Sequence, residues 1–490
     1  MKQLLYSLAI ATLLAAVSCQ KKVTDDVIPN DRLSSDLAFS TPQKIESAVA
    51  GAYNALQDPN FLSGRSLVYV DLQGEDIFDK GAFFGDLPRF NMLSNNGFPL
   101  GVWTAAYTSI ATANRCIAGI EANASLISAE KARQLIAECK FIRAVSHFYL
   151  VNFFAQPFSF TADGSHAGVP LITESFTNNS PEANKPKASV NEVYTRVITD
   201  LNEALADLPE EQDDLYATKT RATKAAAAGI LSRVYLYKND YANAKTFSGQ
   251  IINGNYGSFS LQPSPDGAFG PGNYQTSETI WSIPNNLNDN PNTNNALPQH
   301  YNPNGRGDLA VSKSFTGAAT NPYFAADDKR RTLLLIAGTG ANAGYTFTAK
   351  YPDVATRADW APILRYAEIL LTYAESSARL AAGVDAAAVS ATNEVRDRSR
   401  VGSPAYTVAS FANKDALINA ILGERRIELA FEGHRFWDLM RVKASVSNKY
   451  DNDGVTILPV QAFGADKSIM PIPQVEVDKS RGVLAQNKGY

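Results

Sequence analysis

The stretch RATKAAAAGILSRVYLYKNDYANAKTFSGQII, residues 221–252, decides the fold class. Leu231 and Tyr235 lie four positions apart on one face of a predicted helix, and Asn239-Asp240 makes a turn. A second predicted helix begins with Tyr241 and carries Ala244. Small residues let two antiparallel helices approach closely, and the aromatic rings fill the gaps between them. The stretch therefore predicts a packed helix pair.

This pattern resembles a tetratricopeptide (TPR) unit, a helix pair that stacks on further pairs. Three more pairs are predicted in chain order: 41–57 with 101–121, 130–154 with 189–207, and one within 363–400. A helical solenoid needs about three units to bury its faces. We therefore expect a mainly α fold, a TPR-type helical-repeat scaffold with long loop-rich insertions and a few short strands.

Local signals mark the ends of several predicted helices. Thr41 suits an N-cap and Pro42 the first helical position. Ser189 and Glu192 form a capping box, and Pro209 follows the helix that they open.

Two long regions, about 58–100 and about 255–360, interrupt this scaffold and are expected to be non-helical. The first is rich in phenylalanine, and the second has a strand-like piece at 279–283 and crowds asparagines between 285 and 304. Loops of this length inside a compact protein are usually functional or disordered.

The composition excludes several classes of protein. The chain has 490 residues, of which 45% are hydrophobic and 19% charged, so it is not globally disordered. Lys+Arg total 45 and Asp+Glu 49, a net charge of −4, which argues against nucleic acid as a partner. The three cysteines, at 19, 116 and 139, exclude a disulfide framework but leave one Cys116–Cys139 bridge open.

The N-terminus reads as an export signal. Residues 1–18 have a positive start at Lys2 and a short apolar run, too short to predict a membrane span. The run ends at Ala16-Val17-Ser18-Cys19, which looks like the cleavage site of bacterial lipoproteins. We expect a lipidated Cys19, a tether over 19–35 and a single domain over 36–490. An ordinary cleaved signal followed by a chance cysteine is the alternative.

Several motifs, in order, resemble the SusD/RagB family. The most specific is ERRIELAFEGHRFWDLMR at 424–441, and the others are LAFSTP (37–42), ECKFIRA (138–144), LRYAEILL (364–371), NEVRDR (393–398), PIPQVE (471–476) and QNKGY (486–490). The resemblance covers nearly the whole mature chain. The departures are minor: Lys488 stands where the family pattern usually has proline, and Ser399 where alanine is common.

The resemblance implies a lipid-anchored, surface-exposed protein of the Bacteroidota outer membrane. Loops between the TPR units would form the ligand face, and the protein would sit as a lid on a SusC-like TonB-dependent transporter. Members of the family usually bind nutrients without catalysis, most of them glycans and some of them peptides. The resemblance implies no cofactor.

The loops supply candidate ligand contacts. A sugar presents flat apolar faces and a rim of hydroxyls. A sugar-binding site is therefore expected to combine exposed aromatic rings with amide or guanidinium groups that form hydrogen bonds. The residues expected to bind the ligand are Phe83, Phe84, Arg89, Phe90, Asn95 and Asn96 in the first region and Asn285, Asn286, Tyr301 and Arg306 in the second. The alternative for each phenylalanine is packing against the scaffold. Trp281, Trp360 and Trp437 are expected in the core.

The pattern of acidic residues indicates structural roles rather than catalytic or metal-binding ones. Glu428 and Glu432 are spaced to share one helix face, but the arginines interleaved through 424–441 predict a structural ion-pair network. The cluster Glu75-Asp76 with Asp79 could hold a hard cation, although capping and turn roles are favoured. The four scattered histidines predict no zinc site, and no catalytic residue or metal ligand is proposed.

We therefore expect a cell-surface lipoprotein that binds a glycan or oligosaccharide and delivers it to a SusC-like transporter. Three alternatives remain: a peptide-binding receptor of the same family, a surface glycoside hydrolase using carboxylates such as Glu75 and Asp76, and a TPR scaffold protein.

Overall fold

The computed structural model describes residues 35–176 and 181–490. The predicted signal (1–18) and Cys19 lie outside the described residues. Up to residue 252 the helices are α2 (Ser35–Ala38), α3 (Pro42–Leu56), α4 (Arg65–Gln73), α5 (Gly97–Ala122), α6 (Ala129–Phe154), α7 (Val190–Asp207), α8 (Leu215–Thr220), α9 (Lys224–Tyr237) and α10 (Tyr241–Ile252).

The second half has shorter helices between longer loops. Its helices are α11 (Leu297–Tyr301), α12 (Lys313–Thr316), α13 (Arg330–Leu333), α14 (Tyr366–Leu380), α15 (Ala386–Asp397), α16 (Lys414–Glu428), α17 (Arg435–Arg441) and α18 (Gln474–Lys479). The strands are β1 (Ile77–Asp79), β2 (Ala167–Pro170), β3 (Lys187–Ser189), β4 (Thr279–Ile283), β5 (Leu309–Val311), β6 (Leu335–Ala337), β7 (Thr346–Thr348) and β8 (Ala361–Arg365). They form two-stranded antiparallel sheets, β1–β5, β2–β3, β4–β8 and β6–β7.

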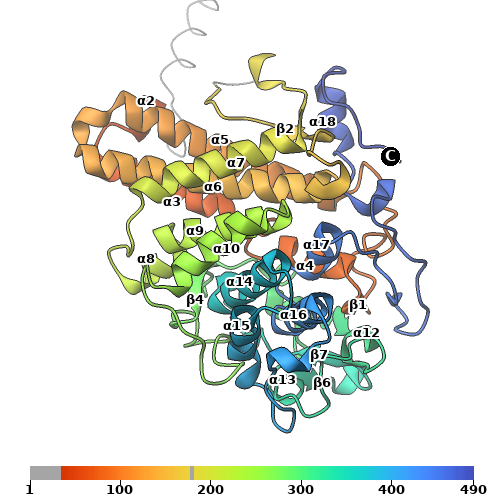
Figure 1. Cartoon of the computed structure of the whole chain (residues 1–490). Helices are drawn as coiled ribbons and strands as arrows, with labels where there is room; N and C mark the ends of the chain where they lie inside the picture. Colours follow the sequence, from red (N-terminus) through yellow and green to blue (C-terminus); the bar gives the residue numbers. More distant parts are fainter. Residues whose placement is uncertain (1–34, 177–180) are drawn as a thin grey trace, which may run out of the picture.

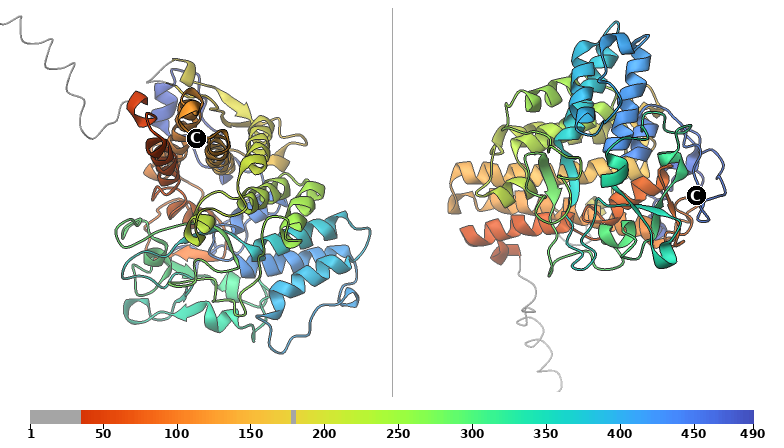
Figure 2. Two further views of the ribbon diagram at one scale, coloured as in Figure 1. Left: turned by 90° about the vertical axis from the view of Figure 1, so that its left-hand side faces the viewer. Right: turned by 90° about the horizontal axis from the view of Figure 1, so that it is seen from below.

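Four helix pairs stack in chain order, which confirms the mainly α, TPR-type fold. The pairs are α3 with α5, α6 with α7, α9 with α10, and α14 with α15. Each pair packs on the next, because α5 contacts α6, α7 contacts α9 and α10 contacts α14. In Figure 1 the long helices α3, α5, α6 and α7 form the upper part, α9 and α10 lie below them, and α14 to α16 lie lower still. Figure 2 shows the same succession from two other sides.

Side-chain caps fix where the scaffold helices begin. The hydroxyl of Thr41 accepts the N–H of Lys44 at the start of α3, and Ser189 and Glu192 form the capping box of α7. Helix α5 begins before residue 101, because the carboxamide of Asn96 caps its first turn.

A buried arginine clamps three helices together. Arg143 of α6 makes two hydrogen bonds of 2.7 and 2.8 Å to the carboxylate of Asp200 in α7. Its third nitrogen donates to Asn114 of α5 (2.8 Å) and to the carbonyl of Thr173 (2.9 Å). A bidentate guanidinium–carboxylate pair is directional, so it fixes the positions of the helices relative to one another.

The expectation that both long regions are non-helical is wrong. The second, 255–360, contains the short helices α11, α12 and α13. The first, 58–100, contains a longer helix. Helix α4 lies there, and its residues from Ser66 to Gln73 are all buried. Because it is covered on every side, it lacks the polar face that makes a helix visible in a sequence.

The segment 424–441 is not one helix. Helix α16 ends at Glu428, the backbone turns through positive φ at Phe431 (67°) and Gly433 (76°), and α17 begins at Arg435. Glu432 therefore lies in the turn rather than on a shared helix face with Glu428.

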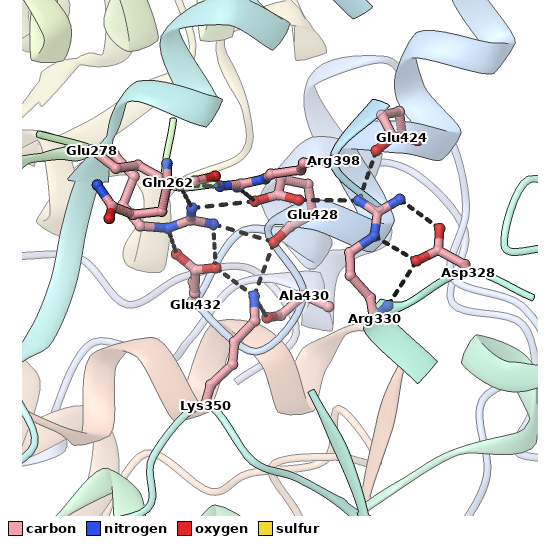
Figure 3. A network of polar contacts seen from close by, with 11 residues as sticks. Gln262, Glu278, Asp328, Arg330, Lys350, Arg398, Glu424, Glu428, Ala430 and Glu432 are labelled. Carbon is pink, nitrogen blue, oxygen red and sulfur yellow. Dashed lines mark hydrogen bonds and ion pairs between the residues drawn. The ribbon is translucent and has the colours of Figure 1, made fainter. Parts of the chain in front are cut away.

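Both carboxylates nevertheless enter a buried ion-pair network (Figure 3). Glu428 binds Arg398 (2.7 Å), Arg330 (3.0 Å) and Arg365 (3.2 Å). Glu432 binds Lys350 (2.6 Å) and Arg365 (2.7 Å). Burial raises the pKa of Glu428, but the surrounding guanidinium groups outweigh it and hold the pKa far below its usual value. A carboxylate locked in this state ties α16 to the second insert and cannot serve as a general acid.

The expected core residues are buried. Trp281, Trp360 and Trp437 are all in the interior, and Cys116 and Cys139 are buried free thiols.

Candidate ligand-binding site

The two inserts, 58–100 and 255–360, lie side by side. Strand β1 of the first pairs with β5 of the second, with Ile77 opposite Val311 and Asp79 opposite Leu309. Gly64 of the first insert packs directly on the backbone carbonyl of Asn295 in the second, and a Cβ at Gly64 would collide with that oxygen. Direct contacts thus join two segments that are far apart in sequence.

A tight turn after β1 presents a pair of phenylalanines. The carboxylate of Asp79 accepts the backbone N–H groups of Phe83 (3.1 Å) and Phe84 (2.7 Å). Phe84 points inward and is fully buried, whereas Phe83 is half-buried at the surface. The two rings meet edge to face at 4.9 Å, and Phe98 lies 5.7 Å from Phe84. Phe83 is therefore a half-buried surface ring held in place by the aromatic side chains packed against it.

Two arginines, one from each insert, flank this ring. The guanidinium of Arg306 lies 4.3 Å from the centre of Phe83, and that of Arg65 lies 5.6 Å from Phe83 and 5.4 Å from Phe98. Arg306 donates to the side-chain oxygen of Asn294 (2.8 Å), and Arg65 donates to its backbone carbonyl (3.2 Å). We call Arg65, Phe83, Phe98, Asn294 and Arg306 the junction site.

Buried groups hold Arg306 in place. Its Nε donates to Asp308 (2.8 Å), and the same carboxylate oxygen lies 2.8 Å from Nδ1 of His300. The ring of His300 is buried against Phe84 at 5.0 Å. The junction site therefore offers an apolar ring and several hydrogen-bonding groups in fixed positions.

Four of the ten residues expected to bind ligand are buried: Phe84, Phe90, Asn285 and Tyr301. Phe90 packs on Phe436 at 5.7 Å, and the hydroxyl of Tyr301 donates to Asp71 at 2.6 Å. The amide of Asn285 donates to the carbonyl of Asp359 at 2.9 Å. These four side chains are committed to internal packing and hydrogen bonds, so their burial contradicts the prediction that they contact the ligand.

Three others are engaged in local structure. Arg89 pairs with Asp451 at 2.7 Å, and Asn96 caps α5. The side-chain oxygen of Asn286 accepts two backbone N–H groups of its own loop, those of residues 288 and 289. Asn95 is exposed. Only Phe83 and Arg306 of the predicted set belong to the junction site.

The junction site also contains Arg65, Phe98 and Asn294, which were not among the residues expected from the sequence. Phe98 and Asn294 stand in stretches whose phenylalanine and asparagine content was visible, but nothing distinguished them from their neighbours. Arg65 follows Gly64 in a segment with no periodic pattern, so no sequence signal pointed to it.

The acidic cluster at 75–76 is part of the internal structure. Glu75 binds Arg435 (3.0 Å from Nε), and Asp76 binds Nε of Arg426 (2.8 Å). Burial raises the pKa of Glu75, but Arg435 and Arg426 outweigh it and bring the pKa below its usual value. Both carboxylates are buried, and Asp79 caps the turn after β1. Within residues 35–176 and 181–490 no group of His, Cys, Asp and Glu is arranged to hold a metal ion.

Two family models match the chain. A model of the SusD family matches residues 336–490, and one described as "starch-binding associating with outer membrane" matches residues 26–236. Among curated proteins, SusD-like protein P2 of Formosa agariphila is 27% identical over 98% of each chain. A SusD-like protein of Bacteroides ovatus is 23% identical over 90% of this chain and 82% of the other.

Solved structures share the fold along almost the whole chain. A SusD superfamily protein from Bacteroides fragilis is 26% identical with a TM-score of 0.79, and covers 91% of this chain and 99% of its own. A putative sugar-binding protein from Bacteroides vulgatus is 25% identical with a TM-score of 0.75, and covers 92% and 99% respectively. No helix in the part of the chain that the structure describes is long and apolar enough to cross a membrane.

Proposed function

Because this chain belongs to the SusD family, we propose that it is a cell-surface receptor that binds a glycan at the junction site and passes it to a SusC-like transporter. The observation that carries the proposal is the meeting of Phe83 with Arg65 and Arg306. These groups come from two inserts that pair directly through strands β1 and β5.

The chemistry of the junction site suits a sugar. A pyranose ring can stack its apolar face on Phe83, while its hydroxyls bind the amide of Asn294 and the guanidinium groups. Ion pairs and ring contacts already fix these side chains, so little conformational entropy is lost on binding. The carboxylate of Asp308, which lies beside the site, is already bound to Arg306 and His300 and is therefore not free to act as an acid or base. We propose binding without catalysis.

The proposed cellular setting follows from the N-terminal sequence and the family. The lipobox-like Ala16-Val17-Ser18-Cys19 supports a lipid anchor at Cys19 in the outer membrane. The family description of association with the outer membrane agrees with that location. A SusC-like TonB-dependent barrel is the proposed partner.

The test of binding uses the mature chain and two variants. Wild type, Phe83→Ala and Arg306→Gln are run through native gels containing soluble starch, xylan, laminarin, galactomannan or polygalacturonate, and are mixed with a peptide pool in calorimetry. Phe160→Ala is the control, because Phe160 is a surface phenylalanine that lies outside both inserts. Circular dichroism checks folding.

We expect one polysaccharide to retard the wild type and the control, and both junction variants to be retarded several-fold less. Equal retardation of all four proteins would overturn the assignment of the junction site. Binding of the peptide pool alone would replace the glycan with a peptide, and no binding at all would overturn the receptor proposal.

A further inference from the structure

A second supported aromatic group lies away from the junction site. Tyr216 of α8 is 47% exposed, and its ring meets Trp360 edge to face at 5.4 Å and 83°. Trp360 in turn stacks on Tyr274 at 5.2 Å with the planes 12° apart. Neither Tyr216 nor Trp360 contacts a ring of the junction site among the described residues. The two groups are therefore separate surfaces.

Hydrogen bonds fix this second group. The indole N–H of Trp360 donates to the carbonyl of Asn285 (3.1 Å), and the hydroxyl of Tyr274 donates to Asp359 (2.5 Å). Helix α8, which carries Tyr216, is capped by the carboxylate of Asp214, which accepts the N–H of Ala217 (2.7 Å). An exposed ring backed by two fixed rings is preorganised for stacking.

The asparagine-rich loop 285–294 links the two surfaces. At one end Asn285 binds Trp360 and Asp359, and at the other Asn294 binds Arg65 and Arg306. Most asparagine side chains between these ends close turns within the loop: Asn286, Asn290 and Asn292 each accept a backbone N–H two residues further on. The loop is thus a largely polar strip of defined shape, interrupted by the exposed side chain of Leu287, with an aromatic group at each end.

We propose that a linear oligosaccharide lies along this strip, with one sugar unit on Phe83 and another, several units away, on Tyr216. This inference rests on the proposed function and deepens it, because it makes the ligand an extended chain rather than a single sugar. Tyr216 then adds affinity only when the ligand is long enough to reach it, as for two linked binding contacts.

The experiment measures affinity against ligand length. Oligosaccharides from the disaccharide to the octasaccharide are prepared from whichever polysaccharide binds in the gel assay. Each is titrated calorimetrically into wild type, Phe83→Ala, Tyr216→Ala and Tyr216→Phe. Phe160→Ala again serves as a matched exposed aromatic, and thermal melts verify that Tyr216→Ala is folded.

We expect Tyr216→Ala to bind the shortest effective oligosaccharide like wild type and to lose roughly five- to tenfold in affinity for the longest. Tyr216→Phe keeps the ring and should match wild type at every length, whereas Phe83→Ala should weaken binding at all lengths. If Tyr216→Ala binds every oligosaccharide like wild type while Phe83→Ala does not, the inference fails and the proposed function stands. If no polysaccharide binds the wild type, both fail.

Discussion

Arg306 lies over the ring of Phe83, with its guanidinium carbon 4.3 Å from the ring centre, although the two residues belong to different inserts. The shared strands of the inserts, β1 and β5, and the contact between Gly64 and Asn295 hold them together. The site and the fold of the inserts are therefore one structure, and a change at their contact should disturb both.

Gly64→Ala tests that contact. The added methyl group would collide with the carbonyl oxygen of Asn295, which is backbone and cannot rotate away. We expect a loss of about 1–3 kcal/mol in the free energy of unfolding, measured by urea denaturation. Ligand affinity should fall as well, because Asn294 is displaced.

Gly51→Ala is the matched control for Gly64→Ala. Gly51 lies within α3, and a Cβ there meets no atom within 4 Å. An alanine in an exposed helix interior should stabilise the chain by about 0.5–1 kcal/mol. Equal effects of the two substitutions would contradict the close approach of the inserts.

The helical scaffold could be predicted from the sequence because the sequence signals for its helices are local. Small residues at helix spacing and capping residues such as Thr41 and Ser189 depend only on near neighbours. The helix expected over 130–154 is found as Ala129–Phe154, for example. Helix α4 was missed because burial on all sides removed its polar face.

The junction site could be predicted only in part, because its residues meet through contacts between segments that are far apart in sequence. Phe83 and Phe84 are neighbours with the same side chain, yet one is half-buried and the other fully buried. Both rings approach His300, at 5.5 and 5.0 Å, but Phe84 also meets the buried ring of Tyr69 in helix α4 edge to face, a contact that the fold creates. Tyr301 looked like a loop aromatic, but its hydroxyl is committed to Asp71 in the distant helix α4.

Glu428→Gln should destabilise the chain strongly. The carboxylate of Glu428 neutralises Arg330, Arg365 and Arg398 in the interior, and a neutral amide leaves buried positive charges uncompensated. We expect a loss of about 3–5 kcal/mol in the free energy of unfolding by urea denaturation. Glu476→Gln, at the exposed pair with Lys479, should change it by less than about 1 kcal/mol. A small effect at Glu428 would show that the network is dispensable.

Asp71 should make stability fall as the pH rises. Burial raises the pKa of its carboxyl to about 8, against the opposing hydrogen bonds from Tyr301 and the N–H of Gly433. Above about pH 4 the unfolded chain releases this proton, whereas the folded chain keeps it until about pH 8. The free energy of unfolding should therefore lose up to ~1.4 kcal/mol per pH unit from this group between those limits.

The free energy of unfolding is measured by urea denaturation at several values between about pH 5 and about pH 9, for the wild type and for Asp71→Asn. The amide does not titrate, so the slope of stability against pH should be shallower in the variant. Asp86→Asn, at an exposed carboxylate, should keep the wild-type slope. Parallel curves for wild type and Asp71→Asn would mean that Asp71 is ionised in the folded chain.

Arg143→Lys tests whether geometry or charge joins α5, α6 and α7. Lysine keeps the positive charge but cannot bind both oxygens of Asp200 while also reaching Asn114 and the carbonyl of Thr173. We expect a loss of about 3 kcal/mol in the free energy of unfolding. Arg133→Lys is the matched control, because Arg133 joins the same helices α6 and α7 through an exposed pair with Asp207. It should stay within about 0.5 kcal/mol of wild type. If both variants were equally stable, charge alone would hold these helices together, and the directional clamp at Arg143 would have to be abandoned.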